Sequence, residues 1–346
     1  MHSLWKFGAV AALGLATALS AQPAAAAMDY KDKRITILIG YGFGGTYGKY
    51  SRLFAEHLAK HIEGSPEVIV QSMPGAGGIK ANNYAYNVMP RDGYHLLTLP
   101  DTAVIVQLLR PNKVKYDARE YRSLGSSNQT NTVLVVRSDT GIRSIQDTYD
   151  KKVIFGHTGP GSTAFLIPST AQALLGAKIE LIGGYKGSSK TILAVEQGEV
   201  QGAAYNWLAW NSKVPQWFEG DEPFARPILQ NGLWRDPDLP KDVPMLSELV
   251  KGDDRKIADF MATLGVIGRG LVLPPGTPKE ALDTLRPAFE AMVKDPDYKK
   301  DVEKRRLRVL YTPGEEVEKA IDNAVDNAPE AVVERAQEMI FGKGQS

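Results

Sequence analysis

The 346-residue sequence contains no cysteine. Disulfide bonds, thiol nucleophiles and lipid-modified cysteines are therefore excluded, and a chain of this length buries enough apolar surface to fold without cross-links. A strong excess of one charge is also missing, because 41 lysines and arginines are matched by 40 aspartates and glutamates, for a formal net charge of +1. A nucleic-acid-binding protein would need a basic excess, so neither nucleic acid nor an anionic membrane is expected as a partner.

Residue patterns of catalysis are scarce as well. The chain has 5 histidines, and the nucleophile pattern G-x-S-x-G does not occur. His57 and His61 stand four residues apart, but Leu58 occupies the position where a zinc-protease motif needs glutamate. We interpret both histidines as solvated side chains and predict no metal site, no cofactor and no enzymatic activity.

The first 27 residues have the pattern of a secretory signal peptide. Lys6 precedes an apolar run from 7 to 19, and an A-x-A pattern closes the segment at Ala27. The run is shorter than the ~20 residues that a membrane-spanning helix needs. We expect cleavage after Ala27, with Ala21 as the alternative, and we favour export over an uncleaved membrane anchor.

Beyond residue 27, short apolar runs alternate with helical patterns, which predicts an α/β fold of about two domains. Strands are expected at 35–39, 67–71, 95–99, 132–137, 152–155 and 178–182, with a short one ending near 206. Helices are expected at 48–62, 79–87 and 164–175. Residues 211–244, rich in proline, tryptophan and aspartate, are predicted to be irregular, and the last third of the chain to be helical.

Two glycine-rich loops, 40–46 and 156–163, each follow a predicted strand and precede a predicted helix. Glycines allow the backbone to turn its N–H groups inward, and a helix N-terminus adds about half a positive charge, so such loops bind carboxylates or phosphates. A tight turn without a ligand explains one such loop equally well. Two of them in an exported two-domain chain favour a ligand held in a cleft.

Nucleotide-binding motifs do not fit the first loop. A P-loop would need glycine at position 43 and serine or threonine at position 50, where Phe43 and Tyr50 stand. The glycines at 40, 42 and 45 match a dinucleotide pattern, but Gln71 and Ser72 stand where the ribose-binding acidic residue belongs. We therefore predict no nucleotide site, and the choice between carboxylate and phosphate stays open at this point.

Aromatic residues crowd the same regions. Tyr41, Phe43 and Tyr47 surround the first loop, and Trp207 follows the last short strand. Aromatic rings in a cleft provide apolar walls, and those of tyrosine and tryptophan add a polar group. Tyr47 and Trp207 are the best candidates for pocket walls, although core packing explains either one.

Several short stretches, in this order and spacing, resemble one known family. They are 44–47 (GGTY), 73–78 (MPGAGG), 90–94 (PRDGY), 156–162 (GHTGPGS), 184–187 (GYKG), 198–200 (GEV) and 274–278 (PPGTP). Over nearly its whole length after residue 27, the chain resembles the extracytoplasmic receptors of tripartite tricarboxylate transporters, the Bug family.

The resemblance implies a periplasmic location and a two-domain periplasmic binding protein of the type II-like, flytrap class, with a mixed sheet flanked by helices in each domain. Domain 1 would comprise 28–130 with 232–346, and domain 2 would comprise 131–231, with crossing segments near 131 and 231. The implied function is that of a monomeric receptor, which captures a small carboxylate and delivers it to the membrane permease subunits of a tripartite tricarboxylate transporter.

In that family both glycine loops donate backbone N–H groups to a carboxylate, and the matching positions here are 44–47 and 158–163. Together with the aromatic and polar residues nearby, the candidate ligand-binding residues are Tyr41, Phe43, Gly44, Gly45, Thr46, Tyr47, Asp101, His157, Thr158, Gly159, Gly161, Ser162, Thr163, Asn206 and Trp207.

The sequence departs from the family pattern at two places. An acidic residue often follows the first glycine cluster, where Gly48 stands here, and a histidine commonly opens the helix after the second loop, where Phe165 or Leu166 stands. Both changes make the expected pocket less polar. They favour an aromatic or aliphatic dicarboxylate over an amino acid or citrate.

Other functions stay open from the sequence. The protein could signal to a sensor kinase instead of serving a permease. An exported hydrolase or isomerase acting on a carboxylate ester or a similar substrate would turn its substrate over, whereas a receptor would bind without turnover. A structural or adhesion module would not respond to a small ligand.

Overall fold

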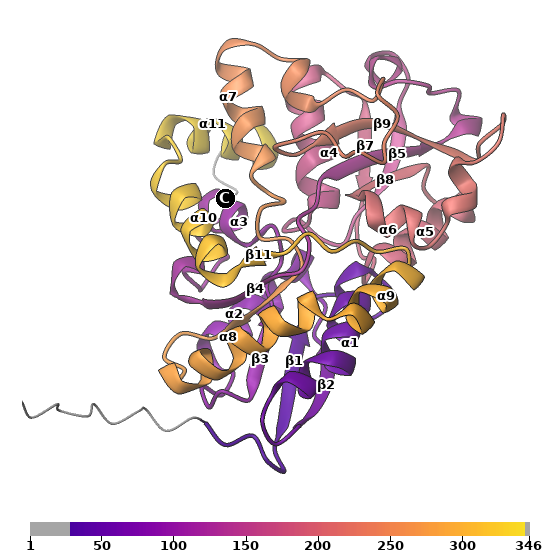
Figure 1. Cartoon of the computed structure of the whole chain (residues 1–346). Helices are drawn as coiled ribbons and strands as arrows, with labels where there is room; N and C mark the ends of the chain where they lie inside the picture. Colours follow the sequence, from indigo (N-terminus) through magenta and orange to yellow (C-terminus); the bar gives the residue numbers. More distant parts are fainter. Residues whose placement is uncertain (1–27, 343–346) are drawn as a thin grey trace, which may run out of the picture.

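Two mixed β-sheets form the centres of two lobes in the computed structural model, which describes residues 28–342 (Figure 1). The predicted signal peptide, 1–27, lies outside the described residues. The first sheet has the order β11-β4-β10-β3-β1-β2, with strands β1 (Arg34–Ile39), β2 (Glu67–Ser72), β3 (His95–Thr98), β4 (Arg122–Ser126), β10 (Gly270–Leu273) and β11 (Thr312–Pro313). The second has the order β7-β6-β8-β5-β9, with strands β5 (Thr132–Arg137), β6 (Val153–Gly156), β7 (Ile179–Ile182), β8 (Gly202–Asn206) and β9 (Ala225–Asn231).

Both sheets contain parallel and antiparallel pairs, which confirms the predicted mixed α/β fold. In the first, β1 runs parallel to β2 and β3, while β10 runs antiparallel to β3 and β4. In the second, β6 runs parallel to β7 and β8, while β5 runs antiparallel to β8 and β9. The helices between and after these strands are α1 (Thr46–His57), α2 (Ile79–Asn87), α3 (Ala103–Leu109), α4 (Thr163–Leu175), α5 (Ser188–Glu196), α6 (Trp207–Asn211), α7 (Gly252–Ala262), α8 (Lys279–Lys294), α9 (Pro296–Lys304), α10 (Gly314–Asp326) and α11 (Glu330–Phe341).

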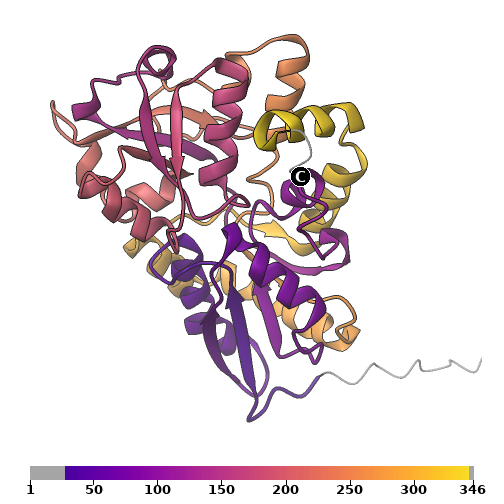
Figure 2. The same ribbon diagram turned by 180° about the vertical axis from the view of Figure 1, so that it is seen from behind.

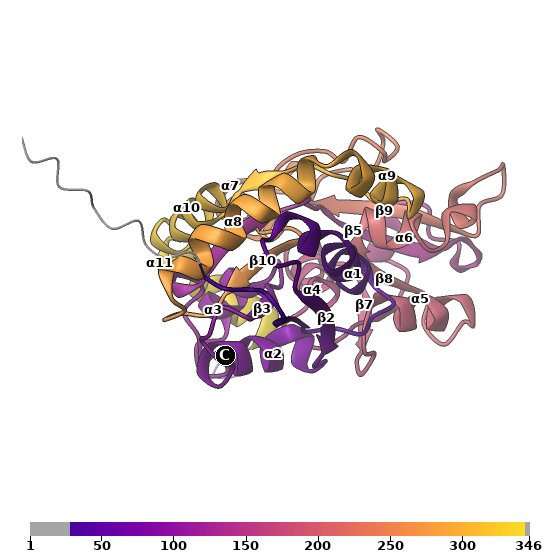
Figure 3. The same cartoon turned by 60° about the horizontal axis from the view of Figure 1, so that its bottom comes forward.

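The first sheet is covered on both faces, and β1 shows why its sequence is an almost unbroken apolar run. Ile35, Ile37 and Ile39 pack on one face with residues of α1 and α8, whereas Leu38 packs on the other face with residues of α2. Alternate side chains of a strand point to opposite faces, so a strand buried on both faces needs apolar residues at successive positions. Figure 3 shows the sheet between α8 and α9 on one side and α2 on the other.

The second sheet repeats this arrangement. Val133 and Val135 of β5 pack with residues of α5 and α6, and Leu134 and Val136 pack on the opposite face with residues of α4. All four side chains are fully buried. The sequence of 132–137 thus predicts its strand correctly because β5 lies inside the sheet, between β8 and β9.

The C-terminal third of the chain serves both lobes. Helices α8, α9 and α10 contact the first lobe through β4 and α1, whereas α7 and α11 contact α4 of the second lobe (Figures 1 and 2). The division into 28–130 with 232–346 and 131–231 stays a prediction. In the structure, residues 246–264 and 332–336 contribute to the core around α4.

Two segments that connect the lobes lie side by side. Residues 127–130 lead from β4 to β5, and residues 263–269 lead from α7 back to β10. They are joined by backbone hydrogen bonds from Thr130 N to Gly265 O and from Arg269 N to Asn128 O. A side chain at Gly265 would collide with the carbonyl of Thr130, so the two main chains meet there at a distance that only glycine permits. Residues 263–269 therefore lead the chain into β10 of the first sheet.

The expectation that 211–244 is irregular is wrong for 225–231, which form β9. The strand was not predicted because of Pro227. Proline cannot donate a backbone hydrogen bond within a sheet and is found at edges and bulges, so its presence argues against a strand. In the structure β9 is an edge strand, and Pro227 lies opposite Val135 at the point where the register shifts. The short strands β4 and β10 were not predicted either, and β4 contains Gly125 at a φ of 136°.

None of the helices described between residues 28 and 342 combines the length and the apolar character that crossing a lipid bilayer requires.

We predict that Leu229→Ala in β9 destabilises the protein by about 2–5 kcal/mol, because it removes a fully buried side chain from a packed core. Leu233→Ala is the matched control: Leu233 lies four residues further on, is 57% exposed, and should change stability by less than about 0.5 kcal/mol. Urea denaturation of both variants measures the two effects. Equal stabilities for the two variants would contradict the assignment of β9 to the core.

Candidate ligand-binding cleft

Loops of the two lobes touch through their main chains. Gly42 N donates to Lys186 O at 2.8 Å, and Gly77 N donates to Thr158 O at 3.2 Å. Beside them, the Lys49 ammonium in α1 donates to the carbonyl of Ser212 at 2.9 Å, at the end of α6. A Cβ atom at the glycine positions along this contact would touch the opposite lobe. Glycine therefore allows the lobes to approach this closely.

A small cavity lies between these loops. The first lobe and the segment before β10 contribute Tyr41, Gly45, Thr46, Tyr47, Asp101 and Arg269. The second lobe contributes Thr158, Ser162, Thr163, Ser188, Tyr205 and Asn206.

Three helices begin at the wall of this cavity: α1 at Thr46, α4 at Thr163 and α5 at Ser188. None of the three has an acidic residue in its first turn or a side-chain cap. Over residues 28–342, the amides of Thr46, Tyr47 and Thr163 donate to no protein acceptor, whereas the amide of Ser162 is used in a turn with Gly159 O. The unsatisfied amides and the helix dipoles leave the cavity with a positive potential and no added charge.

The buried ion pair of Arg269 and Asp101 lines the cavity on the side of the first lobe. Arg269 Nη1 lies 2.9 Å from Asp101 Oδ2, and their side chains are 2% and 6% exposed. The guanidinium also lies over the ring of Tyr47, 3.9 Å from its centroid. Burial by itself lowers the pKa of Arg269, but the neighbouring Tyr47 and Asp101 outweigh burial and leave the pKa above its ordinary value. The two charges largely cancel, so the pair adds little net charge to the cavity.

Two stacked tyrosines form one wall. The rings of Tyr41 and Tyr47 lie 4.6 Å apart at an angle of 16°. Tyr41 Oη donates to Gly77 O at 2.7 Å, and Tyr47 Oη accepts from Asp101 N at 2.8 Å. Burial raises the pKa of both phenols, so both stay neutral. The sequence did not decide whether Tyr47 lies in the pocket or in the core. In the structure Tyr47 lines the cavity.

Hydroxyl groups line most of the remaining surface. The Thr158 hydroxyl is buried and has no hydrogen-bond partner among the described residues, while Ser162 Oγ donates to Gly159 O at 2.7 Å. Asn206 reaches across from the second lobe and donates to Thr46 Oγ1 at 3.2 Å. A surface rich in donors and poor in free acceptors suits an anion.

Six of the candidate residues lie beside the cavity and do not line it. Phe43 is 43% exposed on the outer surface. Trp207 packs against Phe218 in the core of the second lobe, with the ring centroids 4.7 Å apart. His157 packs against Phe165, with the ring centroids 5.1 Å apart, and the other three residues, Gly44, Gly159 and Gly161, meet the opposite lobe. Whether any of the candidate residues binds a ligand stays a prediction.

The positions of the two expected departures from the family pattern both lie outside the lining of the cavity. A side chain at Gly48 would collide with the main chain of Phe43, so this position has no room for an acidic residue. Phe165 and Leu166 pack in the core around α4 and do not line the cavity. Gly48 does not line the cavity either, so the polarity of the cavity is set by the lining residues named above.

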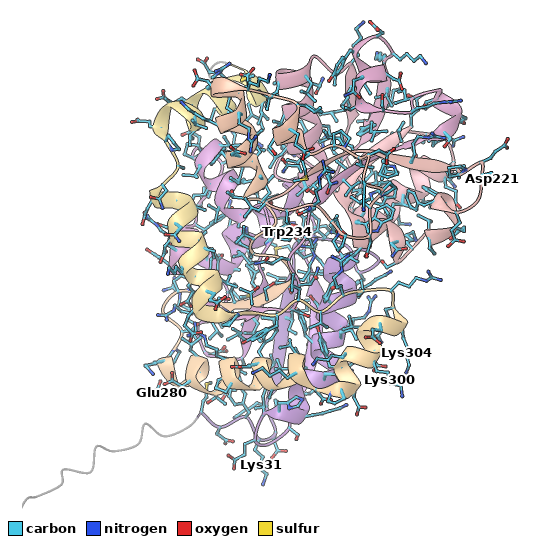
Figure 4. The ribbon with its side chains drawn as sticks, turned by 45° about the horizontal axis from the view of Figure 1, so that its top comes forward. Lys31, Asp221, Trp234, Glu280, Lys300 and Lys304 are labelled. Atoms are coloured by element: carbon cyan, nitrogen blue, oxygen red, sulfur yellow. The ribbon has the colours of Figure 1, made fainter. Side chains whose placement is uncertain are left out.

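The interpretation of His57 and His61 as solvated side chains is wrong for His57, which is 3% exposed and lies 3.1 Å from Asp301. Glu56, His57 and Asp301 are close enough together to share an ion. However, Arg305 pairs with Glu56 and Lys304 pairs with Asp301, so the acidic groups already have cationic partners. Asp221 lies at the tip of an outer loop of the second lobe, away from the contact between the lobes (Figure 4).

Arg269 is the functional candidate that sequence analysis missed. It stands between Gly268 and Gly270 in a stretch predicted to be helical, and a lone arginine between two glycines before an apolar run was its only signal. Tyr205 and Ser188 also line the cavity without having been predicted. Their positions depend on how β8 and α5 meet the first lobe, which local sequence patterns do not contain.

The chain is similar to proteins of a known family. Residues 51–336 match the family described as tripartite tricarboxylate transporter family receptor. A UPF0065 protein from the gbd 5′ region of Cupriavidus necator is 29% identical over 316 residues, which is 88% of this chain and 86% of that protein.

Solved structures share the fold. The periplasmic binding protein BugD is 18% identical with a TM-score of 0.71, covering 89% of this chain and 98% of its own. An R. palustris protein solved with adipate is 19% identical with a TM-score of 0.68, covering 89% and 98%. MatC from Rhodopseudomonas palustris, solved with bound malate, is 18% identical with a TM-score of 0.68, covering 87% and 99%.

The second glycine loop should be sensitive to acid through His157. Burial lowers the pKa of His157, and its Nδ1 accepts a hydrogen bond from Gly159 N at 3.0 Å that only an unprotonated Nδ1 can accept. The folded state therefore binds a proton less readily than the unfolded state. The stability that depends on neutral His157 is fully present above the unfolded pKa of ~6.5 and is lost as the pH falls through the lower folded pKa.

Melting temperatures measured between pH 8 and pH 4.5 test this prediction. His157→Asn is the matched control, because its amide oxygen can accept from the Gly159 amide without titrating. The wild type should lose more stability than this variant as the pH is lowered. The same acid dependence in both proteins would show that His157 is not responsible.

Proposed function

Because the chain belongs to the receptor family of tripartite tricarboxylate transporters, we propose that it is a periplasmic receptor that captures a small carboxylate and delivers it to a membrane permease. A dicarboxylate or an aromatic carboxylate is the favoured ligand. Receptors of this family are periplasmic and bind their ligands without catalysis. The protein would then hold its ligand between the lobes and release it unchanged.

The donor-rich wall of the cavity is the observation that carries the proposal. Unpaired amides at the starts of α1 and α4 and the free hydroxyl of Thr158 can all donate to one anion. An ionised carboxylate is an acceptor-only group, so each of these donors would gain a charge-assisted hydrogen bond. Arg269 and Asp101 compensate each other, so binding would rely on oriented dipoles more than on a free side-chain charge.

The residues that line the cavity favour a dicarboxylate or an aromatic carboxylate as the ligand. Tyr41 and Tyr47 contribute aromatic surface to the cavity, and Asp101, the one acidic residue among the described residues that line it, is paired with Arg269. Within residues 28–342, the cavity therefore offers no unpaired carboxylate that could bind an ammonium group. Adipate and malate, bound by two proteins of the same fold, are both dicarboxylates.

A thermal-shift screen with succinate, adipate, malate, terephthalate, citrate and glutamate tests the ligand class. At a ligand concentration 100 times Kd, binding stabilises the folded state by about 2.7 kcal/mol, which raises the melting temperature by several degrees. We expect this shift with dicarboxylates or aromatic carboxylates and not with glutamate or citrate, and the ligand should be recovered chemically unchanged. A shift with citrate or glutamate alone would overturn the preference, and recovery of a product would identify an enzyme.

Closure of the lobes around the ligand should depend on Gly161. An added Cβ there would lie 2.8 Å from Ala76 O and 2.8 Å from the side chain of Ile79, both on the first lobe. Gly161→Ala should therefore weaken dicarboxylate binding by 10-fold or more, and small-angle scattering should show no compaction when ligand is added. In Gly42→Ala the new Cβ would have Lys186 O at 3.3 Å as its nearest neighbour, so we expect a smaller loss. Equal affinities of Gly161→Ala and the wild type would show that this contact does not form in the bound state.

A further inference from the structure

The hydroxyl oxygen of Thr46 lies where both lobes meet the cavity, and three N–H groups point at it. Nε and Nη2 of Arg269 each lie 3.3 Å from this oxygen. Nδ2 of Asn206, from the second lobe, lies 3.2 Å from it. Thr46 is 4% exposed, and the small exposed part of the residue lines the cavity.

These contacts fix the hydroxyl as a donor. A threonine hydroxyl has one proton and two lone pairs, and the guanidinium fork together with the Asn206 amide occupies both lone pairs. Among residues 28–342, no acceptor receives the Thr46 proton, so this proton is available to a group in the cavity. The orientation of Asn206 is set independently, because its Oδ1 accepts from Ala209 N at 2.9 Å and caps α6.

Arg269 is held so that it acts through Thr46. Nη1 is already engaged with Asp101 Oδ2 at 2.9 Å and with Gly268 O at 3.0 Å, and the face of the guanidinium lies on Tyr47. Its main chain is fixed as well, since its N–H donates to Asn128 O at 2.8 Å. The two nitrogens that remain, Nε and Nη2, are those directed at Thr46.

We propose that Thr46 is a ligand-binding donor selective for an acceptor-only group, and that Arg269 is a positioning residue that acts through it. This inference rests on the proposed carboxylate-binding function. With both lone pairs occupied, Thr46 can donate to an ionised carboxylate but cannot accept from a hydroxyl or ammonium group of the ligand. A ligand donor placed there would lose its water without gaining a partner.

The arrangement also links recognition to closure. Arg269 and Thr46 belong to the same side of the cleft, but Asn206 belongs to the second lobe. The third hydrogen bond to Thr46 therefore forms only when the lobes meet. Donors that polarise a hydroxyl strengthen the bond that its proton makes, so the closed form should bind the carboxylate more tightly through this residue.

Thr46→Val and Thr46→Ser form the first test, with Kd measured by calorimetry for succinate, adipate and terephthalate. Valine keeps the shape and removes the hydroxyl, so we expect a 10- to 100-fold loss of affinity, the range of one hydrogen bond to a charged group. Serine keeps the hydroxyl and should stay within a few-fold of the wild type. Tartrate, the dihydroxy analogue of succinate, should bind the wild type more weakly than succinate does. Tartrate binding as tight as that of succinate would contradict a donor-only Thr46.

A double-mutant cycle separates a positioning role of Arg269 from a structural one. Arg269→Lys keeps a cation beside Asp101 but loses the fork to Thr46. It should weaken binding in the wild-type background and cause little further loss in the Thr46→Val background. A residue that only supports the fold would cost the same in both backgrounds, and that result would overturn the proposal for Arg269.

Asn206→Ser provides a second cycle that does not touch the buried ion pair. Serine can still cap α6, because its oxygen can accept from Ala209 N, but it is too short to reach Thr46. Circular dichroism shows which variants fold, and if Arg269→Lys does not, the cycle of Asn206→Ser with Thr46→Val decides. A wild type that binds none of the three dicarboxylates would overturn the proposed function itself, whereas a wild type that binds with Thr46→Val unaffected would overturn only this inference.

Discussion

The cavity exists because main chains of the two lobes approach one another within hydrogen-bonding distance. Gly42 and Gly77 donate directly to carbonyls of the opposite lobe, and Gly161 lies against the carbonyl of Ala76. Side chains at these positions would hold the lobes apart. The same closeness brings the starts of α1 and α4 to one small volume, so the glycines that allow the contact also create the positive potential between the lobes.

Within that volume the formal charges are balanced. Arg269 and Asp101 are both buried and pair with each other, which avoids the large cost of an isolated buried charge. The pair also orders its surroundings, because Asp101 N donates to Tyr47 Oη and Arg269 donates to Thr46. The ion pair thus acts mainly by fixing neutral groups, the Tyr47 phenol and the Thr46 hydroxyl, in defined roles.

The two segments that connect the lobes also lie close together. The segments 127–130 and 263–269 are hydrogen-bonded to each other, and Arg269 lies at the end of the second one, directly before β10. A residue that contributes to the cavity is therefore part of a segment that joins the lobes. Near this connection, Asn131 donates to the carbonyl of Trp234, which is labelled near the middle of the view in Figure 4. Helices α7 and α11 on α4 extend the contact between the C-terminal third and the second lobe.

Local sequence determined much of the fold. The strand at 132–137 and the helix at 79–87 have the predicted bounds, since each has a regular apolar pattern that its own residues specify. The two glycine loops were recognisable as helix starts for the same reason. Pro227 hid β9, because a proline inside a strand becomes tolerable only when its neighbour in the sheet adjusts its register at a bulge.

The sequence by itself determined which loops can turn their amides toward an anion, because that property depends on the glycines within each loop. Only the tertiary structure decided what those loops face. It placed Trp207 in the core and Tyr47 in the cavity, and it brought Arg269 to Thr46 across 223 positions of the chain. These outcomes depend on where two sheets and two connecting segments meet in space, and no local pattern of residues records a distance between segments so far apart.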